Sequence, residues 1–230
     1  MSGSCDCIIP YFDEGLRPIG VVKSVLGVKS FSRIIVVDDG SHDQSAYHQL
    51  KSQFPQITII RLVKNRGKAE AVRTGLKTAK AHYIFLLDGD LDNIKPEEIE
   101  NAVQKINQNP KIGMIIMRRV QDKTVVLSHW IRHDIIYSGQ RILRRIDLKN
   151  VYKNNISGYD IEVAINTYMQ TNHKIVYWMP FSIHNRSKFQ KWGLFTGLKR
   201  GLRMFDGFIS YAGWKNFISQ TFFFCREEAP

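Results

Sequence analysis

The chain has 230 residues, of which 43% are hydrophobic and 23% charged, a composition typical of folded globular proteins that excludes an intrinsically disordered chain. Lysine and arginine number 33 against 21 acidic residues, and the net charge of +12 indicates a polyanionic partner: nucleic acid, an anionic membrane face or a phosphorylated substrate. The length suffices for one sizeable α/β domain with its own buried core.

Neither a targeting signal nor a membrane span is expected. The first nine residues have no basic segment and no long apolar run, so no signal peptide is predicted. No stretch of about 18 uncharged apolar residues occurs, which argues against a spanning helix. Three cysteines fit a reducing compartment better than a disulfide framework, and Cys5 and Cys7 are expected to be strand thiols on one face. A cytoplasmic location is therefore expected.

Short apolar runs rich in isoleucine and valine alternate with helical stretches through the first half of the chain. Such runs are typical of strands covered on both faces. Pro96, followed by two glutamates, suits the first turn of a helix. The predicted strands are residues 7–9, 34–37, 57–62, 83–87 and 112–117, and the predicted helices are residues 17–29, 43–54, 67–81 and 96–108. This alternation predicts an α/β fold with a mostly parallel sheet and right-handed crossovers.

The pattern changes after about residue 118, where a basic and mixed segment begins. A further helix over residues 159–170 and a short strand over 175–178 are predicted beyond it. No internal repeat and no obvious linker is found, so we expect one domain over residues 1–193 followed by a helical appendage over 194–230.

Polar residues follow four of the predicted strands, at the point where each strand ends. In an open parallel sheet, ligands bind outside the carboxyl ends of the strands, so we expect these residues to converge. Asp88 and Asp90 offer hard oxygen ligands that suit Mg²⁺ or Mn²⁺, and Gly89 between them lets a diphosphate approach the backbone. The four strand ends are Pro10-Tyr11-Phe12-Asp13-Glu14, Asp38-Asp39-Gly40-Ser41, Asn65-Arg66-Gly67-Lys68 and Asp88-Gly89-Asp90-Leu91-Asp92.

Each of these motifs also has a plainer interpretation. An isolated D-x-D motif is usually a solvated acidic turn, but a third acid nearby and the other strand ends favour a metal site here. Asp38 and Asp39 would accept hydrogen bonds from a base or a ribose, or one of them would cap the helix that begins near Asp43. The turn from Asn65 to Lys68 opens a helix, whose free N–H groups favour phosphate, although it lacks the P-loop sequence.

In their order and spacing over residues 5–117, these four motifs resemble family 2 glycosyltransferases of the GT-A fold. The resemblance implies that Asp13 or Glu14 and Asp39 hold the nucleotide and that Lys68 lies near the ribose or diphosphate. A UDP-sugar is the favoured donor, with a GDP-sugar as the other option. The nucleotide-sugar site implied in this way comprises Pro10, Tyr11, Asp13, Glu14, Asp38, Asp39, Asn65, Gly67, Lys68, Asp88 and Gly89.

The same resemblance implies a metal and a mechanism. Asp88 and Asp90 would bind Mg²⁺ or Mn²⁺, and Asp90 counts among the catalytic residues. The metal would stabilise the departing diphosphate while a direct displacement inverts the anomeric centre.

The second half looks similar to polyprenyl-phosphate sugar transferases of the dolichyl-phosphate mannose synthase kind, which makes residues 118–193 the acceptor half and 1–117 the donor half. The similarity lies in Ser138-Gly139-Gln140-Arg141, in Gly158-Tyr159-Asp160-Ile161-Glu162, and in Met179-Pro180-Phe181 followed by Arg186-Ser187-Lys188. Gln140 stands where that group has an aromatic residue. The resemblance implies a lipid or polyprenyl phosphate acceptor, bound by Arg118, Arg119, Arg132, Arg141, Arg186 and Lys188.

The acceptor class also decides whether a general base is needed. A phosphate acceptor needs none, because it is already anionic near neutral pH. A hydroxyl acceptor on a glycan, a glycolipid or a small molecule would need one, and Asp160, Glu162 or Asp134 would supply the carboxylate. On a helix surface the same acids would instead pair with a nearby arginine. The residues leave both acceptor classes open.

The stretch over residues 194–224 carries aromatic side chains about three to five residues apart, interleaved with lysine and arginine. An amphipathic helix of this kind lies in a membrane interface, or it packs its aromatic stripe on the domain or on a second copy of the chain, which would give a homo-oligomer. We expect peripheral contact with the cytoplasmic membrane face. The aromatic positions are Phe205, Phe208, Tyr211, Trp214, Phe217 and Phe222.

Three other classes of protein share part of this pattern. A sugar nucleotidyltransferase usually carries a glycine-rich loop after its first strand, whereas residues 11–15 offer one glycine. A nucleic-acid-binding protein would gather its basic and aromatic residues on a face without acids, so no nucleic acid is expected. A phosphatase with the D-x-D-x-[TV] motif would need threonine or valine where Asp92 stands.

Overall fold

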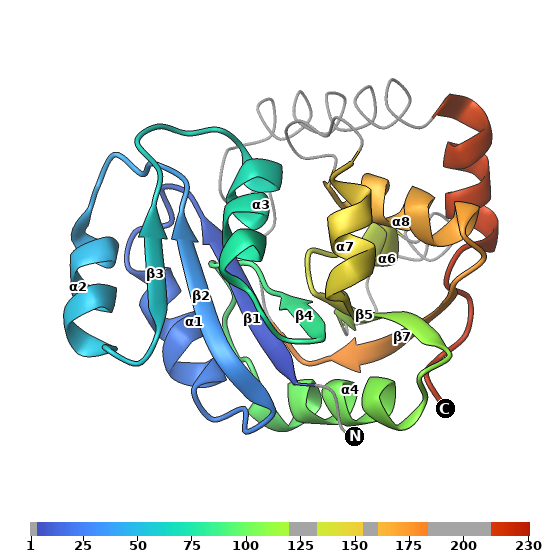
Figure 1. The fold of residues 1–230 in the computed structure, drawn as a ribbon, viewed down its shortest axis with the longest axis horizontal. Coiled ribbons are helices and arrows are strands. Elements are labelled where there is room, and N and C mark those ends of the chain that lie inside the picture. The colour runs from blue at the N-terminus through green and yellow to red at the C-terminus, as the bar shows by residue number, and fades with distance from the viewer. Residues whose placement is uncertain (1–3, 120–132, 154–160, 184–212) are drawn as a thin grey trace, which may run out of the picture.

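The computed structural model describes residues 4–119, 133–153, 161–183 and 213–230, and the statements below concern these parts of the chain. They form a seven-stranded sheet with helices packed on both faces (Figure 1). The strands are β1 (Cys5–Tyr11), β2 (Phe31–Asp38), β3 (Thr58–Arg61), β4 (Tyr83–Leu86), β5 (Ile112–Arg119), β6 (Arg141–Arg144) and β7 (Ile175–Phe181). The helices are α1 (Arg17–Val25), α2 (Ser45–Gln53), α3 (Lys68–Thr78), α4 (Pro96–Gln108), α6 (His133–Ile136), α7 (Arg145–Val151) and α8 (Ile161–Thr171).

The strand order is β3-β2-β1-β4-β6-β5-β7, and β6 alone runs antiparallel to its neighbours in this sheet. The prediction of an α/β fold with a mostly parallel sheet is confirmed. The sequence does not reveal β6, because its four residues have only Ile142 and Leu143 between two arginines. Since β6 is antiparallel to β4, its first residue, Arg141, lies opposite Leu86 at the carboxyl end of β4.

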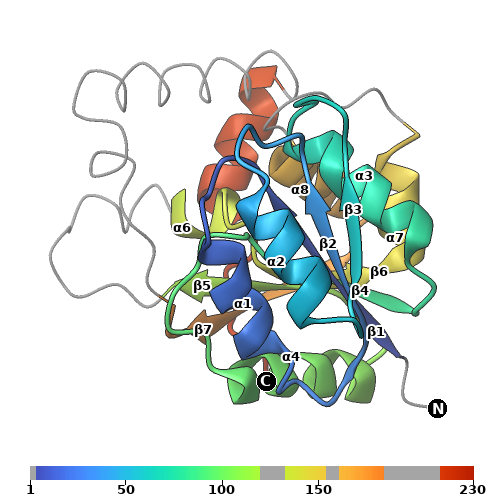
Figure 2. The same cartoon turned by 90° about the vertical axis from the view of Figure 1, so that its left-hand side faces the viewer.

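Two apolar clusters fill the space between the sheet and its helices. Cys5, Cys7 and Ile9 of β1 point into the cluster that includes α1, α2 and α4, whereas Ile8 points into the cluster that includes α3, α7 and α8. This alternation is the two-residue period of a strand. The prediction that Cys5 and Cys7 are buried on one face is confirmed. The helix layers can be followed by turning from Figure 1 to Figure 2.

A proline and a glycine mark where helices α4 and α3 begin. α4 begins at Pro96 as predicted, with Glu97 and Glu98 in its first turn. α3 begins at Lys68, directly after Gly67, whose φ of 89° lies in the left-handed region that glycine adopts without strain. The turn that leads into α3 therefore depends on Gly67.

A helix over residues 213–223 lies beside α8 (Figures 1 and 2). The Gln220 side-chain amide donates to the Thr167 hydroxyl at 3.0 Å. Beyond this helix the chain pairs with β7, where the Trp178 N–H donates to the Glu227 carbonyl. One face of this helical segment thus packs on the domain. The earlier aromatic positions Phe205, Phe208 and Tyr211 lie outside the described residues.

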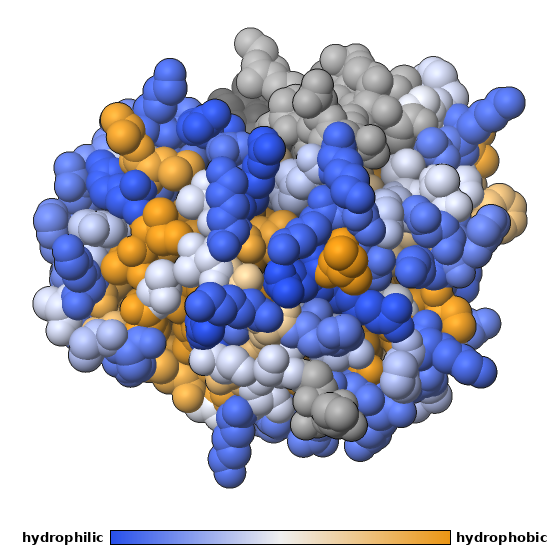
Figure 3. Space-filling view, viewed as in Figure 1, coloured by the Kyte–Doolittle hydropathy of each residue, from blue (hydrophilic) through white to orange (hydrophobic). Residues whose placement is uncertain are grey.

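Hydrophilic side chains cover most of the face seen in Figure 3, and apolar ones show mainly on the side of β2, β3 and α2. There β3 forms one edge of the sheet, and its four residues are half-buried. In the part of the chain that the structure describes, no helix has the length and apolar character needed to cross a membrane.

Candidate functional site

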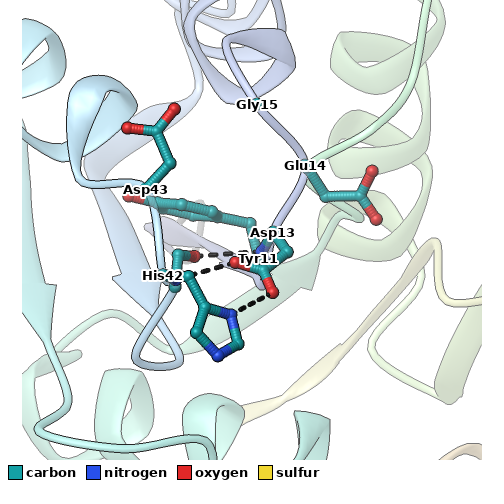
Figure 4. A pocket seen from close by; sticks show the side chains of 7 residues that line it. Tyr11, Asp13, Glu14, Gly15, His42 and Asp43 are labelled. Atoms are coloured by element: carbon teal, nitrogen blue, oxygen red, sulfur yellow. Dashed lines mark hydrogen bonds and ion pairs between the residues drawn. The ribbon is translucent and has the colours of Figure 1, made fainter.

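A hollow of about 250 Å³ opens where β1 and β2 end (Figure 4). Asp13 links the two strand ends: its N–H donates to the Ser41 hydroxyl at 3.0 Å, and its carboxylate accepts the His42 N–H at 2.8 Å. The second Asp13 oxygen lies 2.7 Å from Nδ1 of the His42 ring, which points toward it in Figure 4. The lining residues are Tyr11, Asp13, Glu14 and Gly15 after β1, and Ser41, His42 and Asp43 after β2. Three residues of the predicted nucleotide site therefore share one pocket.

Asp38 and Asp39 are buried, and each shapes a loop. Asp38 accepts the Ser41 N–H at 2.8 Å. Asp39 accepts the N–H groups of Arg66 and Gly67 at 2.9 and 2.8 Å, one on each oxygen. Burial raises the pKa of the Asp39 carboxyl, although these two hydrogen bonds oppose the effect. The two acids thus tie the end of β2 to the turn before α3, while their contact with a nucleotide stays a prediction.

Two other residues of the predicted nucleotide site lie near the end of β1 and in the turn before α3. Pro10 is buried in β1 beside Val37 of β2. Asn65 is exposed, and its side-chain oxygen accepts the Gly67 N–H at 3.1 Å. Asn65 therefore helps to shape the turn before α3, while its contact with the nucleotide sugar stays a prediction.

Lys68, the first residue of α3, lies between two carboxylates. Its Nζ atom is 2.5 Å from Asp88 Oδ1 and 2.7 Å from Glu162 Oε1, and the three side chains are 19%, 25% and 8% exposed in that order. Burial by itself would lower the pKa of Lys68, but the two carboxylates outweigh it and hold that pKa above its ordinary value. The structure thus joins three predicted site residues, from the start of α3, the end of β4 and the first turn of α8, in one charged cluster.

The segment before β6 closes this cluster. The Gln140 side-chain amide donates to Asp88 Oδ2 at 2.6 Å, so both oxygens of Asp88 have partners. Burial would raise the pKa of Asp88, but Lys68 and Gln140 together hold it below its ordinary value. A side chain at Gly139 would displace the ends of Asp88 and Lys68, because an added Cβ would lie 2.5 Å from each Asp88 oxygen and 2.6 Å from Lys68 Nζ. The antiparallel direction of β6 brings these residues to the end of β4.

Arg141 is fully buried and supports the cluster from within the protein. Its guanidinium donates to Asn166 Oδ1 at 2.9 Å, to the Glu162 carbonyl at 3.3 Å and to the Ser138 carbonyl at 3.0 Å. Burial lowers the pKa of Arg141, and the nearby Glu162 opposes the effect. Through these bonds the buried guanidinium positions Glu162 and the segment before β6, while the contact of Arg141 with the acceptor stays a prediction.

Asp90 lies two residues beyond Asp88 and is half-buried. Packing requires the glycine between them, because a Cβ on Gly89 would lie 2.7 Å from Tyr11 Cβ. The donor set fits a hard divalent cation: two carboxylates stand at a strand end, and the place beside Asp88 already holds the positive charge of Lys68. No three acidic, histidine or cysteine side chains of the described residues form a metal-holding group, so such a cation would complete its shell with phosphate and water.

The predicted acceptor residues are described only in part. Arg118 and Arg119 end β5 and are half-buried, and the Arg118 guanidinium lies 5.1 Å from the centre of the Trp178 ring on the neighbouring β7. The described part of the chain leaves out Arg132, Asp160, Arg186, Lys188 and the side chain of Asp134. Their roles stay predictions.

Two polar side chains of the site were missed by sequence reasoning. His42 holds Asp13 together with Ser41, which belongs to the predicted strand end, and Gln140 holds Asp88. His42 follows the acidic end of β2 directly, so its position was a usable signal. Gln140 was visible as a polar residue in place of an aromatic one, but its partner lies 52 residues away in the sequence.

Two curated proteins illustrate the similarity of this chain to known sequences. Dolichyl-phosphate beta-glucosyltransferase of Dictyostelium discoideum is 25% identical over 162 residues, which cover 63% of this chain and 49% of that protein. Poly-beta-1,6-N-acetyl-D-glucosamine synthase of Staphylococcus epidermidis is 31% identical over 127 residues, which cover 53% of this chain and 30% of that protein. The chain thus spans about half or less of the length of these relatives.

A solved structure shows the same fold. Glucosyl-3-phosphoglycerate synthase from Mycobacterium tuberculosis, in complex with Mn²⁺ and UDP-glucose, matches with a TM-score of 0.70 at 17% identity, over 92% of this chain and 79% of that one. This likeness confirms the expected GT-A fold. The family model for glycosyl transferase family 2 matches residues 6–206, which include the ends of β1, β2, β3 and β4. Since this match covers most of the chain, the protein belongs to glycosyl transferase family 2.

Proposed function

We propose that this protein transfers a sugar from a nucleotide-sugar donor to a phosphate-bearing acceptor, with inversion and with the help of Mg²⁺ or Mn²⁺. The observation that carries the proposal is the convergence of carboxylates at one edge of the sheet. The hollow lined by Asp13 and Glu14 adjoins the D-x-D turn, because Gly89 packs against Tyr11, which lines the same hollow. Ligands of open parallel sheets bind at this edge.

Both the nucleoside and the diphosphate of the nucleotide sugar find suitable partners in the site. The N–H groups of the base and the hydroxyls of the ribose would donate hydrogen bonds to the carboxylates of Asp13 and Glu14. Lys68 and the first N–H groups of α3 favour the diphosphate. Asp88 and Asp90 would hold the divalent cation, which supplies charge stabilisation for the departing diphosphate. A UDP-sugar is favoured because the structure from M. tuberculosis contains UDP-glucose and Mn²⁺.

A phosphate-bearing acceptor is supported by the relatives and by the state of Glu162. The D. discoideum relative is named for dolichyl phosphate, and a further structure from M. tuberculosis contains phosphoglyceric acid. Glu162, the candidate general base for a hydroxyl acceptor, is buried and directs an oxygen to Lys68. An acceptor that attacks through an anionic phosphate oxygen needs no such base, whereas attack by a hydroxyl would leave a proton to be removed. The arginines that end β5 supply positive charge for a phosphate in either case.

A lipid-linked acceptor is supported by the outer face of the helix over residues 213–223. Trp214, Ile218 and Phe222 are spaced four residues apart and are 59%, 51% and 44% exposed. This spacing places them on one helix face, and an aromatic and aliphatic face of this kind is typical of helices in a membrane interface.

The test is a transfer assay with labelled UDP-glucose, UDP-N-acetylglucosamine and GDP-mannose. Each donor is offered with a short polyprenyl phosphate, with 3-phosphoglycerate or without acceptor, and with Mn²⁺, Mg²⁺ or EDTA. We expect transfer from one donor to one phosphate-bearing acceptor, abolished by EDTA. Asp90→Asn should lower turnover about 100-fold, a loss typical of removing a group that stabilises charge in the transition state.

Asp92→Asn is the matched control, because Asp92 is exposed in the same turn. Its turnover should stay within about twofold of wild type, as for a surface substitution. Absence of transfer from every donor, even with added lipid extract, would defeat the proposed function. Full turnover in Asp90→Asn would place the metal elsewhere.

A further inference from the structure

Lys68 occupies the place beside Asp88 that a divalent cation would need. The Lys68 ammonium is 2.5 Å from one Asp88 oxygen, and the Gln140 amide is 2.6 Å from the other. Both oxygens are therefore bonded, one of them to a full positive charge. A second cation at Asp88 would meet the ammonium a few ångströms away, in a partly buried site where like charges are poorly screened.

The surroundings of Lys68 offer it a second anchor. Glu162 lies 2.7 Å from the ammonium on the side of α8, and Arg141 holds the Glu162 backbone carbonyl at 3.3 Å. Gly139 lies close against the ion pair, because a Cβ at this position would be 2.5 Å from the Asp88 oxygens and 2.6 Å from Lys68 Nζ. The ammonium is thus confined between two carboxylates, and it can leave Asp88 without leaving the cluster.

Resting on the proposed function, we propose that Lys68 is the built-in counter-ion of Asp88 and that it makes the binding of divalent cation and nucleoside diphosphate interdependent. Without nucleotide, Lys68 and the cation compete for the same carboxylate. A bound diphosphate gives Lys68 a new anionic partner and so frees Asp88 for the cation. Glu162 is a positioning residue, because it keeps Lys68 in the cluster while Asp88 changes its partner.

Binding of Mn²⁺ to the donor-free protein tests this competition, measured by calorimetry and by the electron paramagnetic resonance signal of free Mn²⁺. Lys68→Met removes the charge but keeps most of the length, and it should bind Mn²⁺ about tenfold more tightly than wild type, within the usual range of coupling between sites. Lys77→Met is the matched control, because Lys77 is exposed on the same helix. Its Mn²⁺ affinity should stay within about twofold of wild type.

A second variant tests the competition in the opposite direction. Glu162→Gln leaves Lys68 with Asp88 as its one carboxylate partner in the cluster, so Mn²⁺ binding without nucleotide should weaken by about fivefold. Melting curves in EDTA report whether each variant is folded, and Glu162→Gln carries the test if Lys68→Met does not fold.

Measuring Mn²⁺ binding in the presence of saturating UDP distinguishes failure of the counter-ion role of Lys68 from failure of the metal-dependent sugar transfer. UDP should raise the Mn²⁺ affinity of the wild type about tenfold or more, and that of Lys68→Met by much less, because the competition is already gone. Unchanged or weaker Mn²⁺ binding by folded Lys68→Met would overturn the counter-ion role while leaving sugar transfer intact. A wild type that does not bind Mn²⁺ even with UDP would overturn the metal-dependent function itself.

Discussion

Gly139 contributes to the charged cluster through its lack of a side chain. A Cβ at this position would lie within 2.6 Å of Lys68 Nζ and of both carboxylate oxygens of Asp88. We predict that Gly139→Ala forces Lys68 and Asp88 apart, which lowers donor turnover about tenfold and costs about 1–3 kcal/mol of folding free energy through overpacking. Steady-state assays and urea unfolding measure the two effects.

Gly20→Ala is the matched control for Gly139→Ala. Nothing lies within 4 Å of a Cβ built on Gly20, which is inside α1. Gly20→Ala should therefore keep full turnover and gain up to about 1 kcal/mol of stability, because alanine has the higher helix propensity. Full turnover in Gly139→Ala would show that the cluster can make room for a methyl group.

At the scale of elements, Glu100 fastens α4 to the turn between α1 and β2. Its Oε2 accepts the Ser30 N–H at 3.1 Å, and its Oε1 accepts the Ser30 hydroxyl. Partial burial opposes ionisation, but these hydrogen bonds outweigh it and hold the pKa of Glu100 below its ordinary value. The stabilisation is therefore complete above the ordinary pKa of a glutamate, and it is lost as the pH falls through the lower pKa of the folded state.

Glu100→Gln should cost about 1 kcal/mol at neutral pH, the usual value of such a bond. The difference from wild type should shrink as the pH falls through the lowered pKa of Glu100 in the folded state, because the wild-type carboxyl is then protonated as well. Urea unfolding over a series of decreasing pH values measures this difference. Glu97→Gln, which alters an exposed acid in the first turn of the same helix, should cost no more than about 0.5 kcal/mol. A difference that does not depend on pH would assign the loss to packing.

For the whole molecule, the net charge and the outer face of the helix over residues 213–223 both favour binding to an anionic membrane surface. The net charge is +12, and Trp214, Ile218 and Phe222 are exposed while Gln220 on the same helix is buried. We predict that the triple serine variant of the three exposed residues co-sediments about fivefold less with anionic vesicles, because it loses apolar contact with the interface. Binding of the wild type should weaken when the salt is raised to about 0.5 M, because screening removes the attraction between charges.

Val63 provides the control for this prediction. It is a fully exposed apolar residue in the loop after β3, far from residues 213–223 in the sequence. Val63→Ser should leave vesicle binding within about twofold of wild type, as expected for a lone surface residue. Equal sedimentation of the triple variant and the wild type would assign the helix face to another role.

The sequence alone determined the parallel strands of the first half of the chain and the residues at their ends, because these signals are local. Apolar runs that end in acids identified β1, β2 and β4, and Pro96 marked the start of α4. The carboxyl ends of parallel strands meet at one edge, so the convergence of Asp13 with the end of β2 followed from topology. The family resemblance rested on the same ordered motifs, and the family match confirms it.

The tertiary structure decided how the charged cluster is built. Lys68 meets Glu162 across 94 positions, and Asp88 meets Gln140 across 52. No local period predicts such pairs. The Asp88–Gln140 pair depends on the antiparallel insertion of β6 beside β4, whereas the Lys68–Glu162 pair joins the starts of α3 and α8. The same insertion buries Arg141, which the family resemblance places among the acceptor-binding residues. Sequence patterns report which residues face a core, whereas the partners of buried charges are set by strand direction and by contacts between distant elements.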